Sequence, residues 1–239
     1  VMRIKERLAS AEKSKLWRSQ MEAFYEHLDG AEAPTGGRAL SVSCGKGMWD
    51  YCVLHRTGIN EIHATDIVDC AVHHEDRERL NQEGRWKFQR IAQDRPLPFD
   101  DESFDLVFHQ DVIEHVMRPR LFLAEQHRVL RRGGTLVFGT PNLLRPANIL
   151  KLITGKLVFP SLIGEDELIG EYTHLQEFCT FHLNIMLEET GFCHIKFTHS
   201  FFGISFINMK FCDFPKSNIG KSMCQYITVS CKKIGDQVC

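Results

Sequence analysis

The sequence lacks several features that would place it in common functional classes. Its nine cysteines form no Cys-x-x-Cys pair, so neither a zinc ribbon nor a dithiol redox motif is supported. Lys and Arg number 29 against 31 Asp and Glu, a formal net charge of -2, without the basic excess of a nucleic-acid-binding surface. Lys, Asn or Gly interrupt the apolar runs well before the ~18 residues that a membrane span needs. The sequence therefore predicts no transmembrane segment and no nucleic-acid partner.

The number and positions of the cysteines indicate a cellular compartment. An odd number of cysteines without a signal peptide is typical of a cytoplasmic protein with reduced thiols. Cys193 and Cys231 lie in apolar runs, so both are expected as free thiols in the core. The opening residues Val1-Met2-Arg3 resemble the start of a fragment more than a targeting sequence.

The order of apolar and polar segments predicts one α/β domain. Hydrophobic residues make up 43% of the 239 positions and occur along the whole chain, which is enough for one large core. An amphipathic helix is expected from about residue 10 to 28, ended by Gly30 and a turn at 34–37. Short apolar runs then alternate with helical segments, a pattern typical of parallel strands joined by crossover helices. Strands are expected at 39–43, 61–65, 86–91, 104–109 and 135–139, followed by an antiparallel hairpin of 192–199 and 225–232.

A glycine turn follows the first expected strand. Gly45 and Gly47 let a ligand approach the backbone, and the amides and helix N-terminus there suit a single carboxylate. A dinucleotide fingerprint would have a third glycine where this chain has Asp50, which argues against a pyrophosphate-bearing cofactor. An ordinary tight turn is the alternative interpretation.

Acidic residues stand at the ends of the next two strands. Asp66 closes the second expected strand, where a carboxylate can accept both hydroxyls of a ribose. Asp94 follows the third strand at the same edge of the sheet and can accept an adenine amino group. A helix-capping role for Asp66 is the alternative.

Two later segments carry the most specific pattern, DRPLPFDDESFDLV at 94–107 and DVIEHV at 111–116. With RVLRRGGTL at 128–136 and LEETGF at 187–192, they resemble class I S-adenosylmethionine-dependent methyltransferases of the broad ubiquinone/menaquinone-type and polysaccharide-locus group. The resemblance implies a Rossmann-like, doubly wound sheet of seven strands, mostly parallel with an antiparallel C-terminal hairpin. It also implies an enzyme that uses S-adenosyl-L-methionine and releases S-adenosyl-L-homocysteine.

The resemblance also implies a domain layout and a donor site. We expect one domain over residues 1–239, with an N-terminal helical cap at 1–36 and acceptor-side insertions at 141–176 and 201–223. The segment 141–176 is long enough to act as a mobile lid. The donor-binding residues are predicted to be Ser43, Gly45, Gly47, Asp66, Ile67, Gln93, Asp94 and Gln110.

Two positions depart from the family pattern. Ser41 stands where the family usually has an acidic residue, and Ser43 stands where it usually has a glycine. Ser43 then needs either a negative φ or a modestly strained backbone. Both departures predict weaker binding of the donor.

The family chemistry needs no universal catalytic residue, because the sulfonium already makes the methyl group electrophilic. A hydroxyl acceptor must still lose its proton. His115, near the methyl group by resemblance, and His174 are the candidate bases, with structural roles as the alternatives. Asp111, Glu114 and His115 also resemble a metal-binding triplet, but no second histidine follows closely. We expect no metal there and a helix that braces the glycine turn.

The predicted function is O-methylation of a small molecule, with a sugar or glycolipid ahead of a quinone-type aromatic. The acceptor is expected to be a free small molecule or a glycan or lipid-linked one. A non-catalytic binding or scaffold protein stays open because of Ser41 and Ser43. An NAD-dependent oxidoreductase is a distant third, since Asp50 interrupts the glycine fingerprint.

Overall fold

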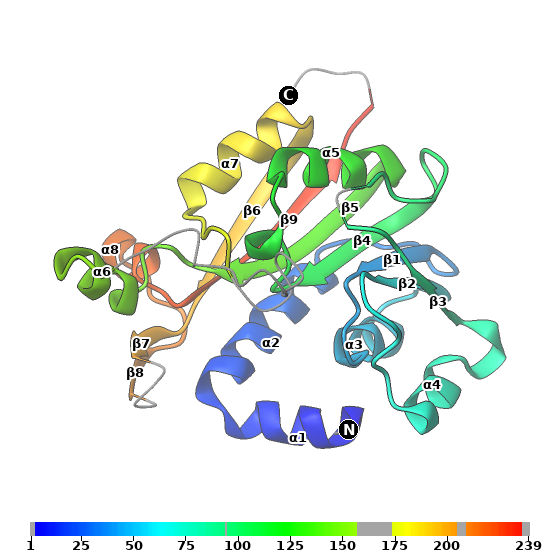
Figure 1. Ribbon diagram of the computed structural model, residues 1–239, viewed down its shortest axis with the longest axis horizontal. Coiled ribbons are helices and arrows are strands. Elements are labelled where there is room, and N and C mark those ends of the chain that lie inside the picture. Colours follow the sequence, from blue (N-terminus) through cyan, green and yellow to red (C-terminus); the bar gives the residue numbers. More distant parts are fainter. Residues whose placement is uncertain (1–2, 94, 157–173, 205–208, 236–239) are drawn as a thin grey trace.

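The computed structural model describes residues 3–93, 95–156, 174–204 and 209–235. The chain forms a seven-stranded sheet with helices on both faces (Figure 1). The strand order is β3-β2-β1-β4-β5-β9-β6, in which β9 runs antiparallel to both of its neighbours. The predicted doubly wound fold with an antiparallel C-terminal hairpin is confirmed.

The strands lie close to their expected positions. β5 is longer than predicted, because Leu130 already pairs with Phe104 of β4 through a register shift. The strands of the large sheet are β1 Arg38–Val42, β2 Glu61–Asp66, β3 Trp86–Arg90, β4 Phe104–Gln110, β5 Leu130–Pro141, β6 Phe192–Ser200 and β9 Tyr226–Lys233. A separate two-stranded sheet pairs β7 Phe202–Ile204 with β8 Met209–Cys212.

The N-terminal helix is two helices instead of the expected one. Ser14 has an extended backbone, and its side chain accepts a hydrogen bond from the Trp17 amide at 3.4 Å, so it caps the second helix. The helices are α1 Ile4–Lys13, α2 Lys15–Asp29, α3 Met48–Arg56, α4 His74–Leu80, α5 Pro119–Val129, α6 Pro146–Ile153, α7 Thr180–Glu189 and α8 Asn218–Ser222. Single turns of 3-10 helix lie at Gln82–Gly84 and Ile113–His115.

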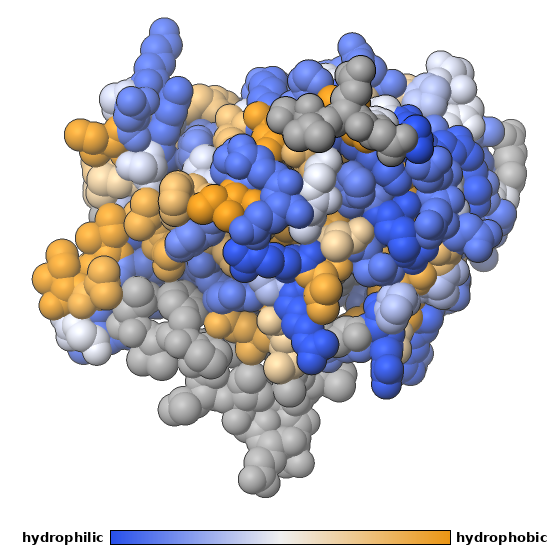
Figure 2. Space-filling model, turned by 90° about the horizontal axis from the view of Figure 1, so that it is seen from above, coloured by the Kyte–Doolittle hydropathy of each residue, from blue (hydrophilic) through white to orange (hydrophobic). Residues whose placement is uncertain are grey.

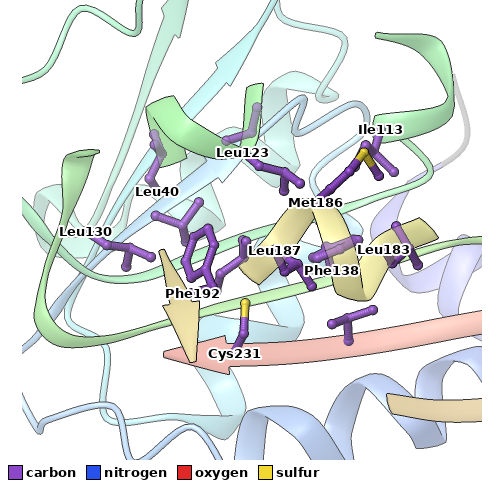
Figure 3. Close-up of a cluster of buried hydrophobic side chains, with 14 of the residues drawn as sticks. Leu40, Ile113, Leu123, Leu130, Phe138, Leu183, Met186, Leu187, Phe192 and Cys231 are labelled. Carbon is purple, nitrogen blue, oxygen red and sulfur yellow. The ribbon is translucent and has the colours of Figure 1, made fainter. Parts of the chain in front are cut away.

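Two apolar clusters hold the layers together, one on each face of the sheet. In β4, Leu106 and Phe108 belong to the cluster beneath α2 and α3, whereas Val107 belongs to the opposite one. In that second cluster, Leu187 of α7 and Phe192 of β6 lie beside Cys231 of β9 (Figure 3). This packing fixes the carboxyl ends of β1, β2 and β4 at one edge, where an open α/β sheet binds its ligands.

The two cysteines expected as core thiols differ. Cys231 is a free, buried thiol, as predicted. Cys193 is buried but disulfide-bonded, which corrects the prediction. Cys193 lies at the beginning of the edge strand β6, where another part of the chain can reach it, and an apolar strand pattern does not reveal such contacts.

The predicted insertions are partly described. Residues 157–173 of the expected lid lie outside the described residues. The preceding stretch is anchored, because the buried Asn142 side chain donates to the carbonyls of Ser222 and Cys224, both at 2.8 Å. Within 201–223 the chain forms β7, β8 and α8. No helix in the described part of the chain is long and apolar enough to span a membrane.

Candidate donor and acceptor site

Two adjoining cavities open at the carboxyl edge of the sheet. The main cavity has a volume of about 380 Å³ and is lined by the ends of β1, β2 and β4, the segment after β3, and α5. The side cavity, about 160 Å³, lies between the glycine turn and the helices α1 and α2. Ser43 and Asp111 line both cavities, so the two spaces meet at these residues.

The glycine turn has a left-handed backbone. Gly45 and Gly47 have φ values of 52° and 76°, which glycine adopts without strain. Ser43 also has a positive φ, 59°, so of the two conformations expected for it the strained one is present. Strain of this kind costs on the order of 1 kcal/mol.

Asp66 lies at the wall of the main cavity and is 6% exposed. Its Oδ2 accepts a hydrogen bond from the Gly45 amide at 2.9 Å, and its Oδ1 accepts one from the Ile67 amide at 2.8 Å. The carboxylate therefore ties the glycine turn to the end of β2. Oδ1 also accepts a longer hydrogen bond from the Val68 amide at 3.5 Å, whereas Oδ2 keeps a second lone pair that can accept a hydroxyl group of a ligand.

The segment after β3 closes the other side of the main cavity. Ile67 and Gln93, both predicted to bind the donor, line this cavity together with Ile91. Asp94, predicted to accept the adenine amino group, lies outside the described residues, and its role stays a prediction.

A buried carboxyl lies beside Ser41, where the family pattern has an acidic residue. Asp50 of α3 accepts hydrogen bonds of 2.6 Å from the Ser41 hydroxyl and from the Trp86 indole N–H. Burial raises the pKa of Asp50 to about 6, although both hydrogen bonds act in the opposite direction. The sequence analysis did not predict the hydrogen bond between Ser41 and Asp50, because it considered Asp50 only as the residue in place of a third glycine.

Asp111 occupies the junction of the two cavities, and solvent reaches it there. Asp111 makes a hydrogen bond with Tyr226, and His174 lies near its carboxylate. Gln110 is 8% exposed, and its Oε1 accepts from the Tyr226 hydroxyl at 3.0 Å. Its buried Nε2 has no hydrogen-bond partner among the described residues, and Gln110 lines the side cavity.

The two histidines predicted as bases lie in contact. His115 lines the main cavity, and the His174 ring meets its ring edge-on with centroids 4.9 Å apart. His174 Nδ1 lies 2.8 Å from Glu177 Oε1. Glu177 also accepts from Arg145 at 2.5 Å and from Asn148 at 2.7 Å.

Glu177 is a buried carboxylate that sequence reasoning missed. Burial acts to raise the pKa of Glu177, but the hydrogen bonds from His174 and its neighbours and the charge of Arg145 outweigh it. The pKa of Glu177 is therefore below its usual value, and the group stays ionised and holds His174 in place. In the sequence, the position of Glu177 three residues after His174 could have indicated this contact.

The same region contains three side chains whose ligand atoms are close enough together to bind a metal ion. Ligand atoms of Glu114, His115 and His174 all lie within 4.8 Å of one another, so the second histidine comes from far along the chain. Glu114 Oε2 accepts from the Thr140 hydroxyl at 2.9 Å, and Leu175 donates its amide to the Glu114 carbonyl. Burial and the nearby Asp111 raise the pKa of Glu114 well above its usual value. A protonated Glu114 is a poor metal ligand and is consistent with a structural role in its contact with Thr140. The expectation that no metal is needed stays a prediction.

A family of methyltransferase domains matches residues 40–138, from β1 into β5. Among curated relatives, the ubiquinone biosynthesis O-methyltransferase of Maricaulis maris is 26% identical over 137 residues, 55% of this chain and 51% of that protein. The dimethylglycine N-methyltransferase of Parasynechococcus marenigrum is 33% identical over 111 residues, 45% of this chain and 39% of that protein. The chain covers between 31% and 59% of the length of these and similar curated relatives.

Solved structures show the same fold at low sequence identity. A methyltransferase of Thermotoga maritima superposes with a TM-score of 0.59 at 15% identity and covers 90% of both chains. A methyltransferase of Mesorhizobium loti has a TM-score of 0.55 at 17% identity, over 88% of this chain and 97% of that one.

Proposed function

We propose that the chain is a class I S-adenosylmethionine-dependent methyltransferase that transfers a methyl group to a hydroxyl of a small molecule; the match of residues 40–138 to a family of methyltransferase domains supports this. The observation that carries this proposal is the meeting of two cavities at Ser43 and Asp111. One cavity can hold the adenosyl part of the donor, and a reacting methyl group can then lie near the junction. A sugar or glycolipid is the proposed acceptor, ahead of a quinone-type aromatic.

The residues present fit the donor. Asp66 offers its carboxylate at the wall of the main cavity, and a side-chain carbon added at Gly45 would meet nothing within 4 Å, so this backbone is open to a ligand. Gln110, whose buried Nε2 has no hydrogen-bond partner among the described residues, lines the side cavity. S-adenosylmethionine supplies an electrophilic methyl group on sulfur, so the protein has to align the acceptor and remove its proton.

We assign the proton transfer to the two histidines. His115 is at the wall of the main cavity, and His174 is held by the ionised Glu177. The negative Glu177 stabilises a positive charge that develops on His174 when a proton arrives. This arrangement supports a hydroxyl acceptor, which must lose a proton during transfer.

The exposed apolar face of α6 supports an acceptor with an apolar part. Leu150, Leu152 and Ile153 are 63%, 65% and 76% exposed, and Ile219 of α8 is 74% exposed. Apolar side chains gather at the end of the molecule that carries α6 (Figure 2). A surface of this kind suits the lipid portion of a glycolipid better than a free sugar.

The non-catalytic alternative loses much of its basis. It depended on the acidic residue missing at Ser41 and on strain at Ser43. Asp50 supplies a carboxyl hydrogen-bonded to Ser41, and the strain at Ser43 is modest in energy.

The proposal predicts two results with the purified chain. S-adenosylhomocysteine should bind with micromolar affinity in calorimetry. With S-adenosylmethionine labelled on its methyl group, label should enter the organic-phase fraction of a lipid extract and be stable to mild base, as expected for a methyl ether. Absence of donor binding would refute the family chemistry, and binding without transfer to any lipid, sugar or quinone fraction would favour the scaffold alternative.

A further inference from the structure

Exposed apolar side chains gather at the end of the molecule that α6, α8 and the β7–β8 pair form (Figure 1, Figure 2). These elements lie together, because α6 contacts β7, and the Asn142 side chain, shortly before α6, donates to the Ser222 carbonyl of α8. Five side chains there are between 60% and 76% exposed, and we call them the apolar end: Leu150, Leu152 and Ile153 of α6, Phe211 of β8 and Ile219 of α8.

The side chains of the apolar end project into solvent, and none of the five lines the main cavity or the side cavity. Leu150, Leu152 and Ile153 fall within four consecutive positions of α6, so at about 100° per residue they point to different sides of the helix. A projecting surface of this kind does not enclose a single acyl chain. It can enter the boundary between the headgroups and the acyl chains of a lipid bilayer.

Positive charge surrounds the apolar end. The one acidic residue in the described stretches 142–156 and 209–223 is Asp213, and its carboxylate pairs with Lys210. Four further lysines are exposed and have no carboxylate within ion-pair distance among the residues that the structure describes: Lys151, Lys156, Lys216 and Lys221. A partner for this surface must therefore offer apolar groups and negative charge side by side.

This charge distinguishes between two partners for the apolar end. A second copy of the chain, related by a twofold axis, would place the same lysines against each other, and their charges would repel. The surface of an anionic phospholipid bilayer instead provides phosphates for the lysines and an apolar layer below them. Lysine side chains can lay their carbon chains along the apolar residues and still reach the phosphates.

α6 is also joined to the candidate site. Glu177 accepts hydrogen bonds from Arg145, which begins α6, and from Asn148 within it, and it lies against His174. One buried carboxylate therefore connects the helix that carries most of the apolar end to a histidine of the candidate site. A chain held at a membrane by α6 would keep this site at a fixed position relative to the lipids.

We propose that the apolar end binds the protein to the surface of an anionic phospholipid bilayer, with its apolar side chains among the lipids and the four lysines against the phosphates. The inference deepens the proposed function and rests on it for the acceptor, since a glycolipid would be met in such a surface. Binding to the bilayer needs no methyl donor, so the two proposals are measured separately.

Sedimentation with lipid vesicles tests the proposal. The probes are vesicles of three parts phosphatidylcholine to one part phosphatidylglycerol, and vesicles of phosphatidylcholine alone. We expect the chain to sediment with the first kind and to bind the second at least tenfold more weakly. Raising the salt concentration from about 0.1 M to about 1 M shortens the screening length from about 10 Å to about 3 Å, and it should release most of the bound protein.

One pair of variants tests the apolar contribution. Leu152→Ser combined with Ile153→Ser should weaken binding to the mixed vesicles roughly 10- to 100-fold, because two exposed aliphatic side chains are lost from the lipid contact. Ile153→Leu is the matched control, since it keeps an apolar side chain at the same position, and it should bind as the unmodified protein does.

A second pair tests the charges. Lys151→Gln combined with Lys221→Gln should weaken binding to the mixed vesicles roughly 10- to 30-fold, at about fivefold for each lysine near an anionic surface. Lys5→Gln combined with Lys13→Gln removes the same charge from exposed positions of α1 and should bind normally. Every variant should keep its affinity for S-adenosylhomocysteine and its urea unfolding midpoint, because all these positions are exposed.

Three results would overturn the proposal. The first is equal or absent binding to the two kinds of vesicle. The second is binding that neither double variant weakens, which would place the lipid contact elsewhere on the chain. The third is a protein that does not bind vesicles but self-associates, and becomes monomeric in Leu152→Ser with Ile153→Ser, since the apolar end would then be an interface between copies. Loss of S-adenosylhomocysteine binding by the unmodified protein would instead refute the proposed function alone.

Discussion

Asp66 has two roles in the proposed site, one toward the protein and one toward the donor. Its oxygens accept hydrogen bonds from the amides of Gly45 and Ile67. A lone pair that remains on the carboxylate can accept a hydroxyl group of the donor. We expect Asp66→Ala to reduce the affinity for S-adenosylhomocysteine by roughly 10- to 100-fold in calorimetry. Asp69→Ala, at an exposed position paired with Arg90, is the control and should bind normally. An unchanged affinity in Asp66→Ala would remove this residue from the site.

Ser43 is held in a left-handed conformation that glycine adopts without strain. Ser43→Gly should therefore raise the free energy of unfolding by about 1 kcal/mol, less the cost of a more flexible unfolded chain. Urea denaturation measures this change, and donor affinity should stay the same or increase. Glu32, which is exposed and has a φ of 51°, provides a comparison at a position remote from the cavities. A destabilised Ser43→Gly protein would mean that the Ser43 side chain makes a compensating interaction.

The two histidines are expected to affect transfer and not donor binding. His115→Ala and His174→Ala should each lower kcat by 10²- to 10⁴-fold, the usual contribution of a general base, at nearly unchanged affinity for S-adenosylhomocysteine. His182→Ala removes an exposed histidine of α7 and should retain full activity. Near-normal kcat in both single variants and in the double variant would contradict the assignment of the base.

At the scale of elements, the single turn Ile113–His115 connects the site to β5 through the Glu114–Thr140 hydrogen bond. We expect methyl transfer to survive dialysis against a strong chelator, because Glu114 is explained by its protein partner and its raised pKa. Activity before and after dialysis, with magnesium or zinc added back, measures this. Loss of transfer on chelation and recovery with either metal would instead assign Glu114, His115 and His174 to a metal site.

The alternation of strands and helices made the fold predictable, since short, nearly continuous apolar runs that alternate with helical segments are typical of buried parallel strands. The break at Ser14 was missed because both halves of the N-terminal region have helical periodicity, and a single capping serine is a weak signal. The glycine turn and Asp66 were placed correctly at one edge because each directly follows a strand. Asp50 was not identified, because its hydrogen bonds come from packing between separate elements, and the same holds for the contact of Glu177 with Arg145.

At the scale of the whole molecule, a buried histidine joins α2 to the antiparallel edge of the sheet. His27 is 1% exposed, and its two ring nitrogens lie 2.7 Å from the Ser230 hydroxyl of β9 and 2.9 Å from the Thr198 hydroxyl of β6. Burial and the charge of Lys196 lower the pKa of His27 to about 4. Protonation of His27 therefore opposes the packing of α2 on the sheet.

This lowered pKa makes the stability of the protein depend on pH. The unfolded chain takes up the proton near pH 6.5 and the folded chain only near pH 4, so stability is full above pH 6.5 and falls as the pH drops through this window. When the pH is lowered from 7 to 4.5, the free energy of unfolding should fall by about 2 kcal/mol less in His27→Gln than in the unmodified protein.

The buried Asp50 acts in the opposite sense, because its pKa is raised to about 6, but both proteins contain it. Urea denaturation at the two pH values measures the difference, and His182→Gln, which removes an exposed histidine, is the matched control. If His27→Gln and the unmodified protein lost the same stability on acidification, the His27 ring would have to accept its proton inside the folded protein at little cost, and its hydroxyl partners would have to rearrange to receive it.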